Sequence, residues 1–360
     1  MTLRDKRQAE FANTWWNHGK FGILNLCPRF GKIRTTINIL KKMKKDCSVL
    51  IAYPDRKIKD SWIEDFEEMG YVNDNITYTT HLSIHKHTGT EFDIVVIDEI
   101  HLLSEAQIGA CVDLFSVNDK IVGLTGTLSK WTKRTLSEDL GLEVIAEYPI
   151  DKAIEEGVIV DYQITVVRVP LDDVTKKNYN GKWKTEKEQF KALSYVINKM
   201  MYSGSGNTMF LRLARMRLIQ NSLAKLNKTK QLLQQYKDER ILVFCGITKI
   251  ADELGIPSHH SKSKDKEAFK RFAEGEGKHM AVVKIGNTGI TYKPLNKVII
   301  NYFDSNAENL AQKINRCMAM EYNTPDKKAD IYIICSDEDV EQKWLNKALE
   351  FFDRNKIIYR

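Results

Sequence analysis

Short apolar runs, separated by stretches with helical periodicity, set the pattern of the first half of the chain. These runs are FGILNL at 21–26, SVLIAY at 48–53, FDIVVID at 92–98 and KIVGLTG at 120–126. After the first of them, Ile33, Ile37 and Leu40 recur at helical spacing. Strands that are apolar on both faces and alternate with helices are typical of a parallel sheet covered on both sides. The pattern predicts an α/β domain over residues 1–160.

The same alternation returns in the second half. Its apolar runs are ILVFC at 241–245, MAVVKI at 280–285, KVIINYF at 297–303 and DIYIIC at 330–335. They predict a second parallel α/β domain over residues 236–360. Residues 161–235 are less regular, with a polar stretch at 171–189 followed by leucines set among Arg and Lys. We therefore expect a connecting segment with one or two helices there.

Composition narrows the class of protein. The 360 residues are 42% hydrophobic and 29% charged, as in a globular rather than a disordered chain. The N-terminal residues are polar, and no apolar run approaches the ~20 residues that span a bilayer. Six cysteines without CxxC spacing are read as reduced core thiols. We expect a soluble, cytoplasmic protein with no membrane partner.

The formal net charge of +7 fits a protein that approaches a phosphate backbone. The same charge is equally compatible with a basic soluble enzyme that has scattered lysines. Charge alone therefore does not identify a partner.

The first candidate site is NLCPRFGKIRTT, which follows the strand at 21–26 and opens a helix. A lysine (Lys32) after Gly31 at a helix N-terminus is the arrangement that binds phosphates. The segment departs from the usual phosphate-binding loop, because Arg29 stands at the first glycine position and Ile33 at the position of the magnesium-binding hydroxyl. Thr35 or Thr36 are possible replacements for that hydroxyl. Alone, the segment fits an ordinary strand-to-helix turn equally well.

The second candidate is the carboxylate pair Asp98 and Glu99, which ends a strongly apolar strand. Ligands of open α/β sheets bind at that end of the strands. An aspartate there can hold Mg²⁺, and the neighbouring glutamate can polarise an attacking water. Two solvated carboxylates are the common alternative, but less so where an apolar strand leads into DEIH downstream of a GK loop. A third segment, GLTGTL at 123–128, is a weak turn motif by itself.

In order and spacing, these segments resemble the motifs of superfamily 2 helicases, closest to phage branch-migration and type III restriction-type DNA helicases. The matching segments are GK (31–32), YPDRKIKDSWIEDF (53–66), DEIH (98–101), LTGT (124–127), YPIDKAIEEGVIVDY (148–162), ILVFCGIT (241–248), KIGNTGIT (284–291) and AQKINRCMA (311–319). The resemblance implies two RecA-like parallel-sheet lobes in tandem, with the ATP site in the cleft between them.

The resemblance also implies roles for individual residues. Lys32 would bind the β- and γ-phosphates, Asp98 would organise Mg²⁺, and Glu99 would be the general base. Gln312 and Arg316 would act on the γ-phosphate from the second lobe. The remaining nucleotide contacts would come from Gln8, Arg29, Gly31, Ile33 and Gly289, and coupling between the nucleotide site and the lobes from His101, Thr125 and Thr127.

A nucleic-acid path is implied as well. It would bind the backbone rather than the bases, with little sequence specificity. The nearest matches to the family's contact residues are Arg56, Lys57, Thr80, Thr248, Asn287 and Thr288. DNA, single-stranded or branched, is favoured over RNA by the LTGT and AIEEGVIVDY segments. A monomer is expected because both halves of the ATP site would lie on one chain.

The last motif departs from the family pattern QRIGRxxR. Ala319 replaces its final arginine and Asn315 its glycine, while Arg316 remains. Loss of a transition-state cation can slow hydrolysis by orders of magnitude. The leading hypothesis is an ATP-dependent DNA helicase or translocase that unwinds, anneals or branch-migrates DNA. The alternatives are an ATP-binding nucleic-acid clamp with weak or partner-activated hydrolysis, and an RNA-directed helicase.

Overall fold

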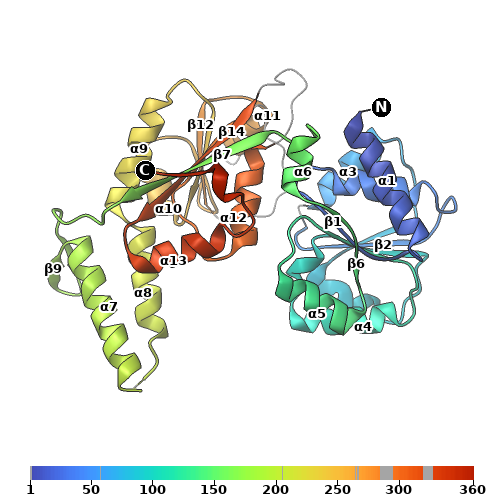
Figure 1. Ribbon diagram of the computed structural model, residues 1–360, viewed down its shortest axis with the longest axis horizontal. Helices are drawn as coiled ribbons and strands as arrows, with labels where there is room; N and C mark the ends of the chain where they lie inside the picture. The colour runs from blue at the N-terminus through green and yellow to red at the C-terminus, as the bar shows by residue number, and fades with distance from the viewer. Residues whose placement is uncertain are drawn as a thin grey trace. The chain divides into compact units, whose positions relative to one another are not determined.

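The chain forms two compact units, the first ending at Val160 and the second beginning at Asp161 (Figure 1). The computed structural model describes residues 2–56, 58–204, 206–263, 265, 267–283, 295–318 and 327–360. The site candidates outside the described residues are Lys57, Asn287, Thr288 and Gly289, together with Ala319 of the last motif.

The first unit is built on a six-stranded parallel sheet with strand order β3-β2-β4-β5-β1-β6. Its strands are β1 (Phe21–Leu26), β2 (Val49–Tyr53), β3 (Ile76–Thr80), β4 (Ile94–Ile97), β5 (Ile121–Thr125) and β6 (Val144–Tyr148). Its helices are α1 (Leu3–Asn17), α2 (Lys32–Leu40), α3 (Ile58–Glu68), α4 (Glu105–Phe115), α5 (Lys130–Leu140) and α6 (Ile150–Glu155), with short 3₁₀ turns η1 (His81–His87) and η2 (Ile100–Leu102). Strands β2, β4 and β5 are buried along their whole length, which explains their uninterrupted apolar sequences.

The second unit is built on a seven-stranded parallel sheet with strand order β11-β12-β10-β13-β14-β7-β15. Its strands are β7 (Asp161–Val169), β10 (Ile241–Cys245), β11 (Ser258–His259), β12 (His279–Val283), β13 (Lys297–Ile300), β14 (Lys328–Ser336) and β15 (Ile357–Tyr359). The helices around it are α9 (Leu223–Gln235), α10 (Thr248–Glu253), α11 (Ala268–Glu274), α12 (Ala307–Ile314) and α13 (Asp339–Ala348), with 3₁₀ turns η3 (Asn315–Cys317) and η4 (Arg354–Lys356). The two units therefore share one fold class, α/β with a parallel sheet.

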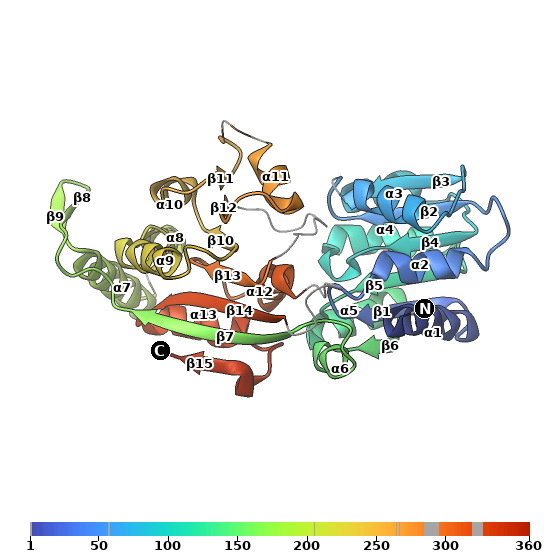
Figure 2. The ribbon, with the colours of Figure 1, turned by 90° about the horizontal axis from the view of Figure 1, so that it is seen from above.

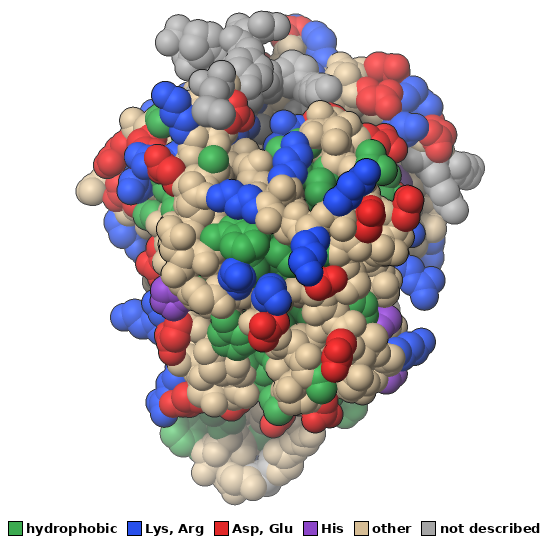
Figure 3. All heavy atoms as spheres, turned by 90° about the vertical axis from the view of Figure 1, so that its right-hand side faces the viewer, with side chains coloured by type: hydrophobic (Ala, Val, Ile, Leu, Met, Phe, Trp, Pro, Cys, Tyr) green, Lys and Arg blue, Asp and Glu red, His purple; other side chains and the backbone are tan. Residues whose placement is uncertain are grey.

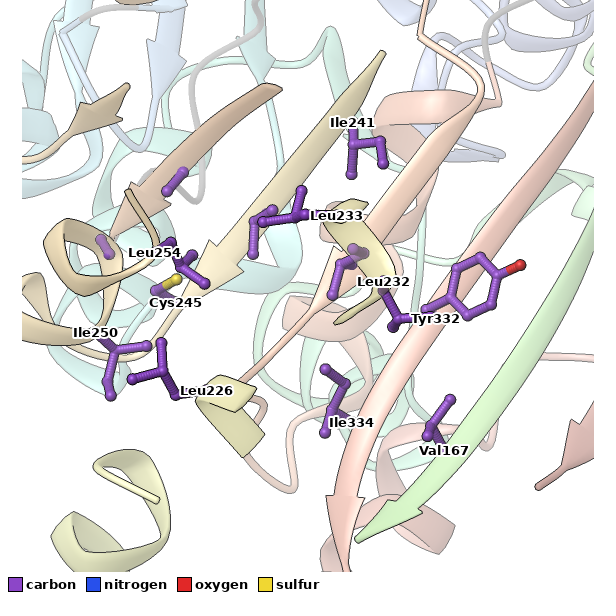
Figure 4. Close-up of a cluster of buried hydrophobic side chains, with 14 of the residues drawn as sticks. Val167, Leu226, Leu232, Leu233, Ile241, Cys245, Ile250, Leu254, Tyr332 and Ile334 are labelled. Carbon is purple, nitrogen blue, oxygen red and sulfur yellow. The ribbon is translucent and has the colours of Figure 1, made fainter. Parts of the chain in front are cut away.

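One face of the second sheet is covered by α9. Leu226, Leu232 and Leu233 of this helix pack with sheet residues such as Ile241 and Ile334 in one buried cluster (Figure 4). Removing this apolar surface from water stabilises the unit by about 25 cal/mol per Å². The leucine spacing that predicts a helix after residue 211 thus reflects the face that α9 buries.

The segment 161–235, predicted as a connector, is part of the second unit. Its strand β7 lies between β14 and β15 and runs parallel to both, with Ile164 in register with Ile331 and Ile357. The strand was missed because its sheet partners follow it by more than 150 residues, so nothing local reveals the pairing. The same segment also supplies α9 to the core described above.

Between β7 and α9 the chain makes an excursion from the sheet. Strands β8 (Lys177–Tyr179) and β9 (Lys182–Lys184) form a small antiparallel pair, and α7 (Glu186–Tyr202) and α8 (Met209–Gln220) form a helical hairpin. In Figures 1 and 2 this hairpin extends away from the second sheet. We call residues 171–222 the arm.

All six cysteines are buried and none forms a disulfide. Burial raises the pKa of Cys27 and of Cys111 to about 12. Thiols held in this protonated state are poor nucleophiles and pack as small apolar side chains. Among the described residues, no helix has the length and apolarity that crossing a bilayer requires.

Candidate active site

Three adjacent strands of the first sheet, β4, β5 and β1, present their carboxyl ends at one edge. Lys32 follows β1, Asp98 and Glu99 follow β4, and residues 125–127 end β5. Because parallel strands all end at the same edge, segments far apart in sequence meet there. This edge therefore collects the three motifs that the sequence singles out in the first unit.

The loop before α2 has an unusual backbone. Both Arg29 (φ 67°) and Gly31 (φ 98°) adopt left-handed conformations, and α2 then begins at Lys32. No described side chain caps this helix. The N–H groups of its first turn have no acceptor within the helix, so they can bind an anion. Ile33 lies in this first turn and contributes its N–H but no hydroxyl.

A side chain at position 31 is disfavoured by a close neighbour as well as by the left-handed backbone. A Cβ at this position would lie 2.4 Å from Nε2 of Gln8, a buried side chain that donates to the carbonyl oxygen of Phe30 at 2.8 Å. The Gln8 amide thus holds the loop through its hydrogen bond to the backbone of Phe30.

We expect Gly31→Ala to lower the free energy of unfolding of the first unit by more than the ~1–2 kcal/mol that a left-handed backbone costs a non-glycine residue. The matched control is Gly70→Ala, because Gly70 also has a left-handed φ (59°) but an added Cβ there meets nothing within 4 Å. Urea unfolding of both variants measures the difference. Equal losses in the two variants would contradict a steric role for Gln8.

Lys32 is held by the acidic pair. Its Nζ donates to Oε1 of Glu99 at 2.8 Å. Burial works to lower the pKa of Lys32, but Glu99 and Asp98 outweigh it, and the net pKa is raised. A Cβ on Gly126 would lie 3.1 Å from the same Nζ, so the glycine after β5 makes room for the lysine. The ammonium group is therefore charged and close to the strand ends.

The two carboxylates differ in their surroundings. Asp98 is buried, and its oxygens accept from Nε1 of Trp62 at 3.2 Å and from the N–H of Glu99 at 3.0 Å. Burial, and then the charge of Glu99, raise the pKa of Asp98 to about 6. For Glu99, burial is outweighed by Lys32 and His101, so its pKa is lowered. Asp98 thus accepts from two neutral donors, whereas Glu99 forms an ion pair with Lys32.

Glu99 has a left-handed backbone, with φ 48°. A non-glycine residue in this region costs of order 1–3 kcal/mol and persists only where the surroundings enforce it. Here the conformation turns the chain from β4 into η2, and the adjacent Asp98 and Glu99 make different contacts. Such strain at the end of a central strand is typical of a functional site.

A hydrogen-bond chain links the ends of β4 and β5. Oγ1 of Thr125 donates to the carbonyl oxygen of Thr127 at 2.8 Å and lies 2.9 Å from Nδ1 of His101. The hydroxyl proton is used by the carbonyl, so the network assigns the donated proton to Nδ1 of His101. Burial lowers the pKa of His101, and the nearby Glu99 carboxylate acts in the opposite direction. His101 also lies 3.5 Å from Glu99, so Thr125 and Thr127 are connected to the acidic pair through His101.

Two residues of the site were not predicted in their roles. Trp62 of α3 contacts the Asp98 carboxylate, and Nε2 of His81 lies 2.9 Å from the Asp98 carbonyl oxygen. Burial lowers the pKa of His81 to about 4, so this ring is neutral and its contact is with the backbone of Asp98. For Trp62, the available signal in the sequence was a tryptophan in the helix after β2. For His81, which follows β3, the sequence contained no signal.

Thr35 and Thr36 do not replace the missing hydroxyl of the phosphate loop. Both side chains are buried, and each hydroxyl donates to a carbonyl oxygen one turn earlier, of Gly31 and Lys32, at 3.1 Å. They point along the helix, because a threonine three or four residues into a helix satisfies its hydroxyl on the preceding turn. Both hydroxyls are therefore engaged within α2.

The nucleic-acid candidates are distributed over both units. In the first, exposed Arg56 follows β2 and partly exposed Thr80 ends β3, at the same sheet edge as the acidic pair. In the second, Thr248 begins α10 directly after β10. These are positions at the carboxyl ends of strands, where the loops of a parallel sheet bind ligands.

The remaining catalytic candidates lie in the second unit. Gln312 is partly exposed on α12, and Arg316 is buried in η3, one turn further along the chain. The structure thus brings Lys32, Asp98 and Glu99 together within the first unit. A shared site formed with Gln312 and Arg316 stays a prediction.

The comparison with protein families defines the class. The family described as "Helicase conserved C-terminal domain" matches residues 224–320, within the second unit. The second unit therefore contains a helicase C-terminal domain, and the two parallel α/β units resemble the RecA-like lobes of helicases in fold.

Three known proteins are similar to the chain in sequence or in fold. The chain is 24% identical over 323 residues to the "DNA 3'-5' translocase XPB2" of Sulfurisphaera tokodaii, covering 80% of this chain and 72% of that protein. It is similar in fold to the Hef helicase domain of Pyrococcus furiosus, with a TM-score of 0.56, 14% identity, and 94% and 98% of the two chains covered. It is also similar to S. cerevisiae Dbp5, solved with RNA and ADP BeF3, with a TM-score of 0.60, 12% identity, and 94% and 85% covered.

Proposed function

We propose that the chain is an ATP-dependent DNA translocase or helicase that unwinds, anneals or branch-migrates DNA. The observation that carries the proposal is the ion pair between Lys32 and Glu99 beside buried Asp98, at the carboxyl edge of a parallel sheet. The similarity to a DNA translocase over most of both chains supports DNA as the substrate. Its backbone would be bound with low sequence specificity.

In this proposal Lys32 exchanges partners when ATP binds. Its Nζ leaves Glu99 for the β- and γ-phosphates, while the free N–H groups at the start of α2, including that of Ile33, contact the same anion. Gly31 and Arg29 shape the loop around the phosphates. Glu99, released from the lysine, accepts a proton from the attacking water. The Lys32–Glu99 ion pair is thus the arrangement of the lysine and the general base before ATP binds.

Mg²⁺ fits the residues that are present. Each oxygen of Asp98 accepts one hydrogen bond and keeps a second lone pair, and burial raises the pKa of this carboxyl, so a bound cation would stabilise its charged form. Mg²⁺ commonly takes one or two carboxylates, phosphate oxygens and water. Asp98 would hold the ion without the usual loop hydroxyl. When bound, the ion neutralises phosphate charge.

Further residues complete the proposed site. Gln312 and Arg316 would reach the γ-phosphate from the second unit, and Arg316 would neutralise charge in the transition state. Gln8 would contact the adenine, and Gly289 would lie beside the nucleotide. His101, Thr125 and Thr127 would transmit the state of Glu99 to the end of β5, because their hydrogen-bond chain starts at that carboxylate.

The nucleic acid would cross the carboxyl edges of both sheets. Arg56, Thr80 and Thr248 would contact phosphates there, as would Lys57, Asn287 and Thr288. We propose single-stranded or branched DNA as the preferred form, and a monomer as the active species, because the residues proposed for catalysis all lie on one chain.

The test is the rate of ATP hydrolysis with single-stranded DNA, duplex DNA, matched RNA and no nucleic acid, at one salt concentration. We expect stimulation by DNA, and loss of stimulated turnover in Lys32→Ala, which removes the phosphate-binding cation. No stimulation by any nucleic acid, with Lys32→Ala equal to the unaltered chain, would contradict the proposal. Stronger stimulation by RNA than by DNA would instead indicate that RNA is the substrate.

A second candidate function is an ATP-dependent nucleic-acid clamp that turns over slowly. It is favoured by Ile33 at the hydroxyl position and by the burial of Thr35 and Thr36. It predicts tight ATP-dependent DNA binding with undetectable phosphate release. Brisk turnover that disappears in Glu99→Gln would eliminate it.

A further inference from the structure

The arm holds most of the net charge of the protein. Residues 171–222 contain ten Lys and Arg but four Asp and Glu, so they carry +6 of the formal net charge of +7. From Gln189 to Lys237 the sequence has no acidic residue, although 48 are present in the chain. Elsewhere the charges nearly balance, and Figure 3 shows basic and acidic side chains mixed over the face it presents.

Lys177 and Lys187 of the arm form ion pairs with Glu186 and Asp173, but the exposed cations of its helical hairpin lack carboxylate partners. On α7 and α8 the exposed cations are Lys191, Lys199, Arg212 and Arg217, and none of them forms an ion pair with a carboxylate in the described part of the chain. Partly buried Arg215 stacks on Phe190 and donates to Oγ of Ser194 at 3.1 Å. Burial, and then Arg212, lower the pKa of Arg215, a sign of like-charge crowding. An anion against this surface would relieve the repulsion.

Large aromatic side chains are exposed among these cations. The exposed fraction is 68% for Trp183 on β9, 68% for Tyr195 on α7, 93% for Tyr202 at the end of α7, and 77% for Phe210 at the start of α8. Exposed rings interleaved with cations are the surface on which unpaired bases stack while phosphates are neutralised. A folded duplex offers the phosphates but not the faces of its bases.

The base of the arm is fixed to the second unit. Buried Glu186, at the start of α7, accepts from Nζ of Lys177 at 2.9 Å, from the N–H of Leu223 at 2.7 Å and from Oγ of Ser222 at 3.1 Å. An apolar cluster of the arm also packs against Trp344 of α13; its buried members are Leu171, Phe190, Leu218 and Ile219. The base of the arm is therefore packed against α9 and α13 of the second unit.

We propose that the arm is a further nucleic-acid contact, outside the helicase motifs, which binds a single-stranded segment by cations on its phosphates and aromatic rings on its bases. This inference rests on the proposed function, since it names where the same substrate makes additional contacts. Nucleic acid is the occupant because the arm has exposed cations and aromatic rings but no acidic residue from Gln189 to its end at Ser222.

The test uses two matched pairs of variants of the full chain. Lys191→Gln with Lys199→Gln removes two exposed arm lysines, and its control, Lys44→Gln with Lys45→Gln, removes two exposed lysines after α2. Tyr202→Ala with Phe210→Ala removes two arm aromatics, and its control is Trp131→Ala, 75% exposed in the first unit. Fluorescence anisotropy with a labelled 20-nucleotide single strand and a 20-bp duplex, without nucleotide, gives affinity as a function of salt.

The arm lysine variant should make the slope of log affinity against log salt shallower by about 1.4, because each lost phosphate contact on a single strand contributes about 0.7. The aromatic variant should weaken single-strand binding at least about 5-fold, with a smaller effect on the duplex. Neither control should change these values.

Arm and control variants that bind alike would overturn the arm proposal, as would arm variants that alter self-association on size-exclusion chromatography while leaving DNA affinity unchanged. Both outcomes leave DNA-stimulated ATP hydrolysis by the unaltered chain intact, so the proposed function would stand. Failure of the unaltered chain to bind or respond to any nucleic acid would overturn both.

Discussion

Glu99→Gln is expected to lower the rate of ATP hydrolysis about 10²–10⁴-fold, the range over which a general base contributes. The amide cannot take the proton of the attacking water, but it fills the same volume. Nucleotide binding should be retained or strengthened, because Lys32 loses the carboxylate that holds its Nζ at 2.8 Å and is free to reach phosphate. Steady-state phosphate release and binding of a fluorescent ATP analogue measure the two effects separately.

The control for this variant is Glu105→Gln, which neutralises an exposed glutamate in the first turn of α4. It should change neither quantity. A Glu99→Gln enzyme that hydrolyses ATP at the rate of the unaltered chain would remove Glu99 from the role of base. Loss of nucleotide binding together with turnover would instead show that the Lys32–Glu99 pair maintains the loop.

Lys225→Met should reduce the free energy of unfolding of the second unit by about 3–5 kcal/mol, the cost of leaving a buried charge without its partner. Nζ of Lys225 donates to Oε1 of Glu341 at 2.6 Å, and these side chains are 1% and 0% exposed. Oε2 of Glu341 also accepts the N–H of Ser336 at 2.7 Å. The pair therefore ties α9 to α13 and to the end of β14.

The double variant Lys225→Met with Glu341→Gln should recover most of the loss, because the amide is neutral and still accepts from Ser336. The control is Lys249→Met, an exposed lysine 3.8 Å from Glu253, which should cost at most about 1 kcal/mol. Hydrogen exchange of peptides from β10 and β14 in increasing urea reports the stability of this unit alone. A Lys225→Met loss no larger than that of Lys249→Met would mean that water reaches Glu341.

The sequence alone determined where the chemistry of the first unit lies. Asp98 and Glu99 come directly after an apolar strand, Lys32 begins the helix that follows another, and Thr125 ends a third. Strands apolar on both faces pair in parallel, and all such strands end at one edge. The meeting of these residues thus follows from local patterns together with one rule of sheet topology.

Only the tertiary structure decided which groups serve those residues. Trp62 and His81 contact Asp98, and the hydroxyls of Thr35 and Thr36 turn inward to the helix. No spacing in the sequence specifies these contacts, because each depends on how a helix or turn settles against a neighbouring strand. The same holds for the pair of Lys225 with Glu341, buried together although 116 positions apart.

For the arm and β7, too, the sequence predicted some features and only the tertiary structure decided others. The basic, acid-poor stretch was visible in the sequence, as were its helical leucines. That β7 enters the second sheet, and that Glu186 fixes the arm to α9, was decided by partners far along the chain. Local periodicity specifies the elements, whereas the burial of polar groups and the pairing of distant strands are settled only when the chain has folded.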